Sequence, residues 1–185
     1  MLQSNKINWV GLASGAIIII ILITSFFVPW WILKVGDNLV EARVSPIYTY
    51  FNFVGDSFTI PLIWALNIAS IISFAIGGIV MLFYSIKPTE KYSKKLLDFS
   101  YKKPLYSVIF FIVGLFLTTY LVSSLFNFQV PLYGTILSKM PTNMTQGATV
   151  TIQMSAEFIW PFWIAIIATA TNIAAKVYHN KVIAK

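Results

Sequence analysis

The sequence predicts an all-α membrane protein: a four-transmembrane-helix bundle with a small extracytoplasmic β-rich cap built from its two outer loops. The chain of 185 residues is 58% hydrophobic and 10% charged. Its apolar residues gather in four segments of about 20 residues, the length that a helix needs to cross a hydrocarbon layer. Most of its basic residues fall on one side of those segments. We therefore expect one membrane domain over residues 1–185.

The four apolar segments cover residues 9–28, 61–84, 104–126 and 161–178. Pro61, Pro104 and Pro161 each open one of them, which suits a first helical turn because the N–H of that position has no intrahelical partner. No Asp, Glu, Lys, Arg or His lies in the interior of a segment, and Lys176 belongs to the basic tail that ends the fourth. Ionisable groups at bilayer depth are typical of proton-coupled carriers, so this pattern argues against a proton-driven pump.

The basic residues set the expected topology. Ten of the 13 lie in the tail around Lys6, in the inner loop 85–103 and in the tail 176–185, and such residues mark the cytoplasmic side. We expect a multi-pass plasma-membrane protein with both termini in the cytoplasm and outer loops 29–60 and 127–160. This placement also accounts for the net charge of +7, so nucleic acid is not an expected partner.

The inner loop carries six lysines from Lys87 to Lys103, interleaved with aromatic and leucine residues. A short amphipathic helix over 89–101 would set the apolar side chains into the interface and bring the lysines to anionic lipids. An ordinary positive-inside loop explains the same residues equally well.

The outer loops contain strand patterns. Residues 31–35 and 39–44 flank Gly36-Asp37-Asn38, a hairpin signal, and 48–54 is an aromatic run. In the second loop, 148–154 alternates Thr and Gln with apolar residues, so we expect both loops to share one small sheet. The candidate outer contact surface consists of Trp30, Trp31, Tyr48, Tyr50, Phe51 and Phe53; packing of the cap onto the bundle is the alternative. Asn143 begins an Asn-Met-Thr glycosylation sequon in the second loop.

Small and polar residues suggest how the helices meet. Side chains of this kind at four-residue spacing let two helices approach closely, chiefly within one chain and secondarily in a dimer. The helix-packing candidates are Gly11, Gly15, Ala65, Ala69, Ser73, Gly77 and Gly114. Asn67 and Asn172 are candidate polar sites in the bundle, for hydrogen bonds between helices or for contact with a solute.

The sequence offers no reaction centre. It has no cysteine and one histidine, His179, which lies beyond the fourth segment among lysines. Thiolate metal sites, bis-histidine haem ligation and a serine–histidine hydrolase are unsupported. We expect a protein that is not an enzyme and holds no cofactor or metal.

Four segments with both ends inside, a longer strand-forming first outer loop and a strand in the second resemble the claudin and peripheral-myelin-protein tetraspan superfamily. Trp30 and Trp31 stand where that family has its first tryptophan, while its Gly-Leu-Trp motif and two cysteines are missing. The resemblance implies cell–cell contact. The expected function is contact with other membrane proteins or with itself, as an adhesion module or accessory subunit. The alternative is a small-solute transporter or channel subunit with Asn67 and Asn172 along its path.

Overall fold

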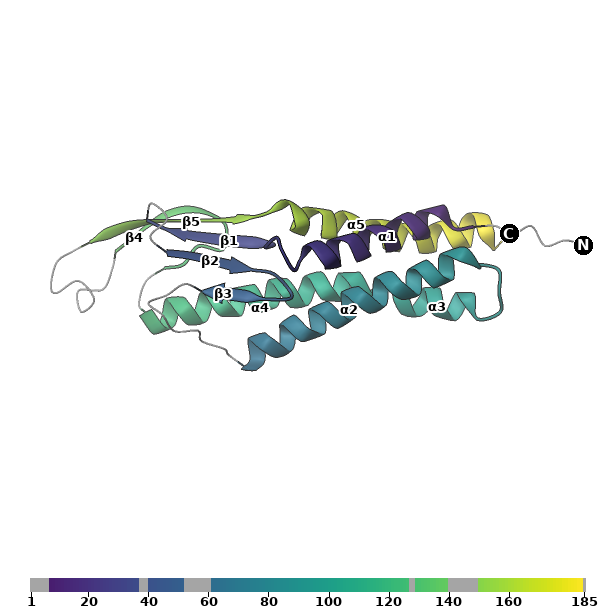
Figure 1. Ribbon diagram of the computed structural model, residues 1–185, viewed down its shortest axis with the longest axis horizontal. Coiled ribbons are helices and arrows are strands. Elements are labelled where there is room, and N and C mark those ends of the chain that lie inside the picture. Colours follow the sequence, from purple (N-terminus) through teal and green to yellow (C-terminus); the bar gives the residue numbers. More distant parts are fainter. Residues whose placement is uncertain (1–6, 37–39, 52–60, 127–128, 140–149, 185) are drawn as a thin grey trace, which may run out of the picture.

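The computed structural model describes residues 7–36, 40–51, 61–126, 129–139 and 150–184. The helices lie along the long axis of an elongated molecule, and the strands gather at one end of them (Figure 1). We call this the sheet end. The opposite end, where α1 begins and α5 ends, is the terminus end.

Four long helices make the bundle: α1 (Trp9–Thr24), α2 (Pro61–Ile86), α4 (Lys103–Phe126) and α5 (Trp160–Tyr178). A short helix, α3 (Ser93–Ser100), follows α2, and a π-helical turn, η1 (His179–Ile183), extends α5. The amphipathic inner helix predicted over 89–101 is therefore present but shorter.

Three helical stretches are long and apolar enough to cross a membrane: Pro61–Ile86, Ser93–Ser124 and Trp160–Ile183. The first predicted span, 9–28, contains the apolar α1 of 16 residues. This helix ends at Thr24, and the chain then leads into β1 of the sheet. The hydroxyl of Thr24 donates to the carbonyl of Ile21 at 3.0 Å, and that of Ser25 donates to the same carbonyl at 2.6 Å.

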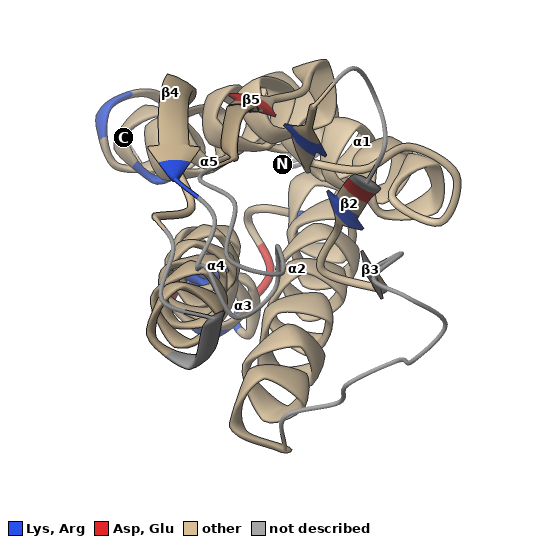
Figure 2. Cartoon of the chain, turned by 90° about the vertical axis from the view of Figure 1, so that its left-hand side faces the viewer, with Lys and Arg blue, Asp and Glu red and all other residues tan. Residues whose placement is uncertain are grey.

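The helices form a ring in which α1 packs against both α2 and α5, and α2 packs against α4. Contact between α4 and α5 closes the ring but is less extensive. Seen from the sheet end, α1 lies beside α5 and α2 lies beside α4 (Figure 2).

The sheet has five antiparallel strands in the order β3-β2-β1-β5-β4. The first loop supplies β1 (Trp31–Val35), β2 (Val40–Val44) and β3 (Thr49–Phe51), and the second supplies β4 (Gly134–Lys139) and β5 (Thr151–Phe158). Pairing of β1 with β5 joins the two loops, so the predicted single sheet is confirmed. Strand β5 starts and ends later than predicted, and β4 was not predicted. Strand β3 covers residues 49–51 of the predicted run 48–54, whose residues 52–54 lie outside the described residues.

One apolar core runs from the bundle into the sheet. It unites buried residues of the helices, among them Ile18, Phe74, Phe111 and Phe162, with buried residues of the strands, among them Trp31, Leu33, Val35 and Met154. The sheet is therefore packed onto the helices as a cap.

Candidate contact surface

Trp30 lies at the centre of the bundle's sheet end. None of its surface is exposed. Its ring centroid lies 5.7 Å from that of Phe74, 5.0 Å from that of Phe111 and 6.3 Å from that of Phe162, and its Nε1–H donates to the Ser25 hydroxyl at 2.7 Å. We call these four rings the aromatic cluster. Since indole burial with a satisfied N–H is strongly favourable, this residue anchors the first loop in the bundle.

Trp31 is also buried, with 1% of its surface exposed, and its Nε1–H donates to the Leu132 carbonyl at 2.8 Å. The prediction that Trp30 and Trp31 form an outer contact surface is therefore wrong, because both side chains are buried within the chain. Both fill the junction between cap and bundle, the alternative that the sequence left open.

The other predicted contact residues lie in or next to β3. Tyr48 is half-buried, and burial raises the pKa of its phenol, an effect that the nearby Arg43 opposes. The backbone of Tyr50 pairs with that of Arg43. The side chains of Tyr50 and Phe51, and all of Phe53 and Asn143, lie outside the described part of the chain.

Among the described residues of the cap, the most exposed large apolar side chains lie on the β4 side. Tyr133, just before β4, is 70% exposed, and Leu137 within it is 74% exposed. Leu137 stands opposite Gln153 of β5. Among the described residues β4 pairs only with β5, so its other side is a sheet edge. We call Tyr133 to Lys139 the β4 edge; it projects beyond the helices (Figure 1).

The predicted packing residues serve two faces of α2. Gly77 is buried against Lys103 and Pro104 of α4, and Gly114 of α4 lies beside Leu66 and Asn67. Gly77 and the candidates Ala65, Ala69 and Ser73 recur every four residues on this face of α2. The other three are more open: Ala65 is exposed, and Ala69 and Ser73 are half-buried.

The second face of α2 packs against α1. Gly15 lies against Leu82 and the carbonyl of Gly78, and Gly11 lies against Met81 and Ser85. Gly78 was missed by the four-residue spacing, yet it lies directly against Ile18 and Ile19 of α1.

The two candidate asparagines differ in role. Asn172 is fully buried: its Oδ1 accepts from the Ser14 hydroxyl at 3.0 Å, and its Nδ2 donates to the carbonyls of Ser100 and Tyr101, each at 3.3 Å. It thus links α5 to α1 and to the α3–α4 junction. Asn67 instead donates from Nδ2 to Thr49 Oγ1 of β3 at 3.1 Å, a bond between helix and cap.

A second polar group at the terminus end was not predicted. Asn8 Nδ2 donates to the Tyr84 hydroxyl at 2.8 Å and to the Ala175 carbonyl at 3.1 Å. The same hydroxyl lies 2.8 Å from Nδ1 of His179, which is buried. The one sequence signal was Asn8 immediately before α1, because asparagine is a favoured helix N-cap; its Oδ1 accepts from the N–H of Gly11.

The ring contacts and hydrogen bonds described above stabilise the packing of the helices and the cap. Every buried side-chain nitrogen and oxygen of the described residues has a hydrogen-bond partner, and these residues include no group of three His, Cys, Asp or Glu side chains that could hold a metal ion. What the described surface offers is the β4 edge, where exposed apolar side chains lie along a strand that pairs with β5 alone among the described residues. No family model matches this chain, and no curated protein is significantly similar to it.

Proposed function

We propose that this chain is a non-enzymatic integral membrane protein that binds other proteins through its outer cap, as an adhesion-like module or as an accessory subunit. Four helices cross the bilayer, the sheet lies outside, and both termini lie in the cytoplasm. The β4 edge is the contact surface.

Lipid-facing side chains support four spans. Large apolar residues are exposed on each long helix, including Ile20 on α1, Ile72 on α2, Phe116 on α4 and Ile167 on α5. Water would penalise so many exposed apolar groups, whereas lipid tails accommodate them. At about 1.5 Å per residue α1 is about 24 Å long, and the exposed Phe26 and Phe27 follow it. These two rings extend the apolar surface to the headgroup region, where aromatic residues gather.

The distribution of lysines supports the orientation. The described basic residues of the terminus end lie between the end of α2 and the first residue of α4, in the last turn of α5 and in η1: Lys87, Lys91, Lys94, Lys95, Lys102, Lys103, Lys176 and Lys181. The described strands of the sheet carry Lys34, Arg43 and Lys139, and Arg43 forms an exposed ion pair with Glu41. The positive-inside rule places the richer end in the cytoplasm.

The single observation that carries the proposed function is the exposed apolar edge of β4. A sheet edge offers N–H and C=O groups to an added strand, and apolar side chains beside them strengthen that pairing. Charged side chains, proline, bulges or a covering element usually protect such edges. Here a charge, Lys139, lies at the end of β4, while the apolar Leu137 and Tyr133 are exposed along the β4 edge, which favours a protein partner.

A solute path, the alternative function, gains no support from the bundle's centre. The aromatic cluster fills the sheet end, and both asparagines proposed for such a path are engaged in hydrogen bonds with this chain. Large buried rings and satisfied amides describe a packed core.

The test compares two neighbouring positions on the cap. Leu137→Asp places a charge on the β4 edge, and Gln153→Asp places the same charge directly opposite it on β5, where Gln153 is also exposed. The two tagged variants and the wild type are purified from native membranes in mild detergent, and co-purifying proteins are counted by mass spectrometry. We expect Leu137→Asp to lower a stoichiometric partner, or self-association, at least tenfold, and Gln153→Asp to change it less than twofold. A chain recovered without any stoichiometric partner or self-association would refute the proposal.

A further inference from the structure

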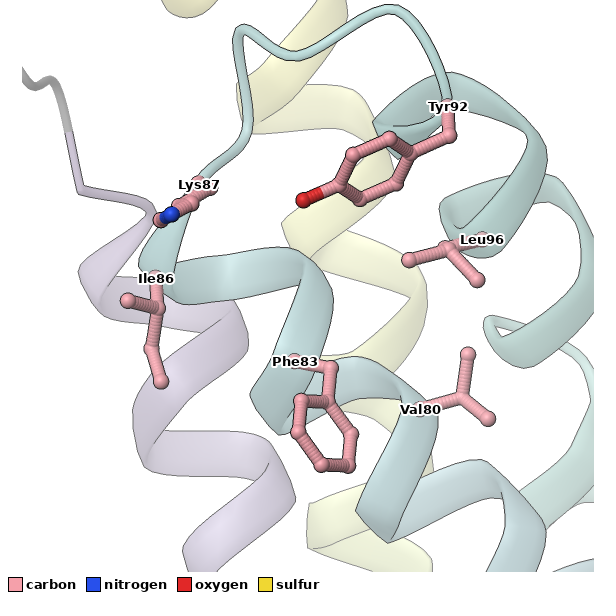
Figure 3. A pocket seen from close by; sticks show the side chains of 6 residues that line it. All are labelled: Val80, Phe83, Ile86, Lys87, Tyr92 and Leu96. Carbon is pink, nitrogen blue, oxygen red and sulfur yellow. The ribbon is translucent and has the colours of Figure 1, made fainter.

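A groove lies between the last turns of α2 and the start of α3 (Figure 3), at the end of the bundle opposite the sheet (Figure 1). Its volume is about 350 Å³. Side chains of both helices and of the segment between them line it: Val80, Phe83, Ile86, Lys87, Tyr92 and Leu96. Tyr92 reaches from the α3 side across the groove toward α2 (Figure 3).

The lining of the groove has an apolar part and a polar part. Val80, Phe83 and Leu96 make an apolar wall, whereas Lys87 and the Tyr92 hydroxyl are polar and lie toward the end of α2 (Figure 3). Phe83 is 67% exposed and Tyr92 51% exposed. An apolar slot with a cation and a hydroxyl at one end matches a molecule with an apolar chain and an anionic head.

Contacts on the buried side of α3 hold this helix beside α2 and α5. On the buried side of α3, Leu97 packs with Met81 and Tyr84 of α2. The Ser93 hydroxyl donates to the Lys87 carbonyl, and Asp98 pairs with Lys176 of α5 at 2.9 Å. Because these contacts fix α3 against two helices, a ligand would not have to order the groove on binding.

Charge around the groove favours an anion. Lys91, Lys94 and Lys95 are exposed on the connection and on α3. Of the carboxylates in the same segment, Asp98 is paired with Lys176, and Glu90 is exposed beside Lys91. The local balance is positive, and such a surface next to a membrane attracts anionic lipid headgroups.

We propose that this groove binds one anionic phospholipid, with an acyl chain against Val80, Phe83 and Leu96 and the phosphate beside Lys87 and the Tyr92 hydroxyl. This inference rests on the proposal that the helices cross a membrane, with α3 at its cytoplasmic surface. It does not depend on the role of the cap. It goes beyond a general attraction of lysines to headgroups, since it assigns one lipid to one place.

The test counts bound lipid on four single-residue variants. Wild-type protein and variants in mild detergent are titrated with dioleoyl phosphatidylglycerol or dioleoyl phosphatidylcholine, and native mass spectrometry records the bound molecules. Lys87→Gln removes the cation of the groove, and Lys91→Gln removes a neighbouring exposed lysine that does not line it. Leu96→Trp fills the slot, and Phe99→Trp adds the same ring to an exposed position of α3 outside the lining.

We expect one saturable phosphatidylglycerol per chain. Binding should weaken about fivefold in Lys87→Gln, the effect of one lysine near a headgroup, and less than twofold in Lys91→Gln. Leu96→Trp should abolish the saturable site and Phe99→Trp should keep it. Equal phosphatidylglycerol binding by Lys87→Gln and Lys91→Gln, or phosphatidylcholine binding as tight as that of phosphatidylglycerol, would overturn the inference.

Carbonate extraction of native membranes separates this outcome from failure of the membrane proposal. If wild-type chain is released by carbonate, the proposed membrane embedding itself is refuted. If it stays in the membrane and the lipid count does not respond to Lys87→Gln, only the lipid site is refuted.

Discussion

The two halves of the bundle hold their helices together differently. In the sheet half, Trp30 enters from a loop and meets Phe74, Phe111 and Phe162, so large rings fill the space between helices. In the terminus half, α1 and α2 approach through glycines, and buried amides and hydroxyls bond across the helices. Lipid tails offer little apolar gain for helix association, so close packing and hydrogen bonds are the usual substitutes. In the half that borders the cap, the centre is filled by a large aromatic side chain from a loop; in the terminus half, the residue that enters from outside the helices is the smaller, polar Asn8.

The largest expected effect comes from removing that side chain. Trp30→Ala would leave a cavity inside the aromatic cluster and should lower the free energy of unfolding by about 3–5 kcal/mol. The measurement is equilibrium unfolding in mixed micelles, followed by circular dichroism. Trp160→Ala is the matched control, because Trp160 is 48% exposed; it should cost less than about 1 kcal/mol. Equal costs for the two substitutions would show that the sheet half does not depend on its central ring.

Sequence patterns predicted the elements whose signals are local. The long apolar segments gave α2, α4 and α5, the Gly36-Asp37-Asn38 signal gave the β1–β2 pair, and alternation gave part of β5. Each depends on residues within one short window. The strand signal in the sequence of β4 is weaker, since Gly, Thr, Ser and Lys surround Ile136 and Leu137. It forms because β5 supplies a strand to pair with.

The burial of particular side chains could not be predicted in this way. Aromatic residues at the edge of an apolar segment suit a headgroup belt and a packed core equally well. Trp30 is buried because Phe74, Phe111 and Phe162 surround it from three helices, and His179 because Tyr84 of another helix lies beside it. No sequence window contains those neighbours.

The next expected effect contrasts glycines from the two halves. A methyl group added at Gly78 would lie 2.6 Å from Cγ2 of Ile18 and 3.1 Å from its Cβ. Because a β-branched side chain in a helix cannot turn away, Gly78→Ala should lower the free energy of unfolding by about 1–3 kcal/mol. The same methyl group at Gly114 would meet Leu66 and Asn67 no closer than 3.6 Å.

Gly114→Ala should therefore leave the free energy of unfolding unchanged or raise it by up to about 1 kcal/mol, since alanine has a higher helix propensity than glycine. Unfolding in mixed micelles measures both variants. If Gly114→Ala destabilised the protein as much as Gly78→Ala, close helix approach would not be confined to the terminus half, and the contrast between the halves would fail.

The smallest expected effect compares the two asparagines. Asn172→Ala would remove one of the two acceptors of the Ser14 hydroxyl, the other being the Ala168 carbonyl, and the donor to the carbonyls of Ser100 and Tyr101. The expected cost is about 0.5–1.5 kcal/mol in the free energy of unfolding. Asn67→Ala would remove one partly buried bond to Thr49, and because water can replace that donor the cost should stay below about 0.5 kcal/mol. Unfolding in mixed micelles, with the Ser14→Ala and Asn172→Ala double variant, isolates their coupling. If Asn67→Ala proved the costlier change, hydrogen bonds to the cap would matter more than those between helices, and the polar network would not be what distinguishes the terminus half.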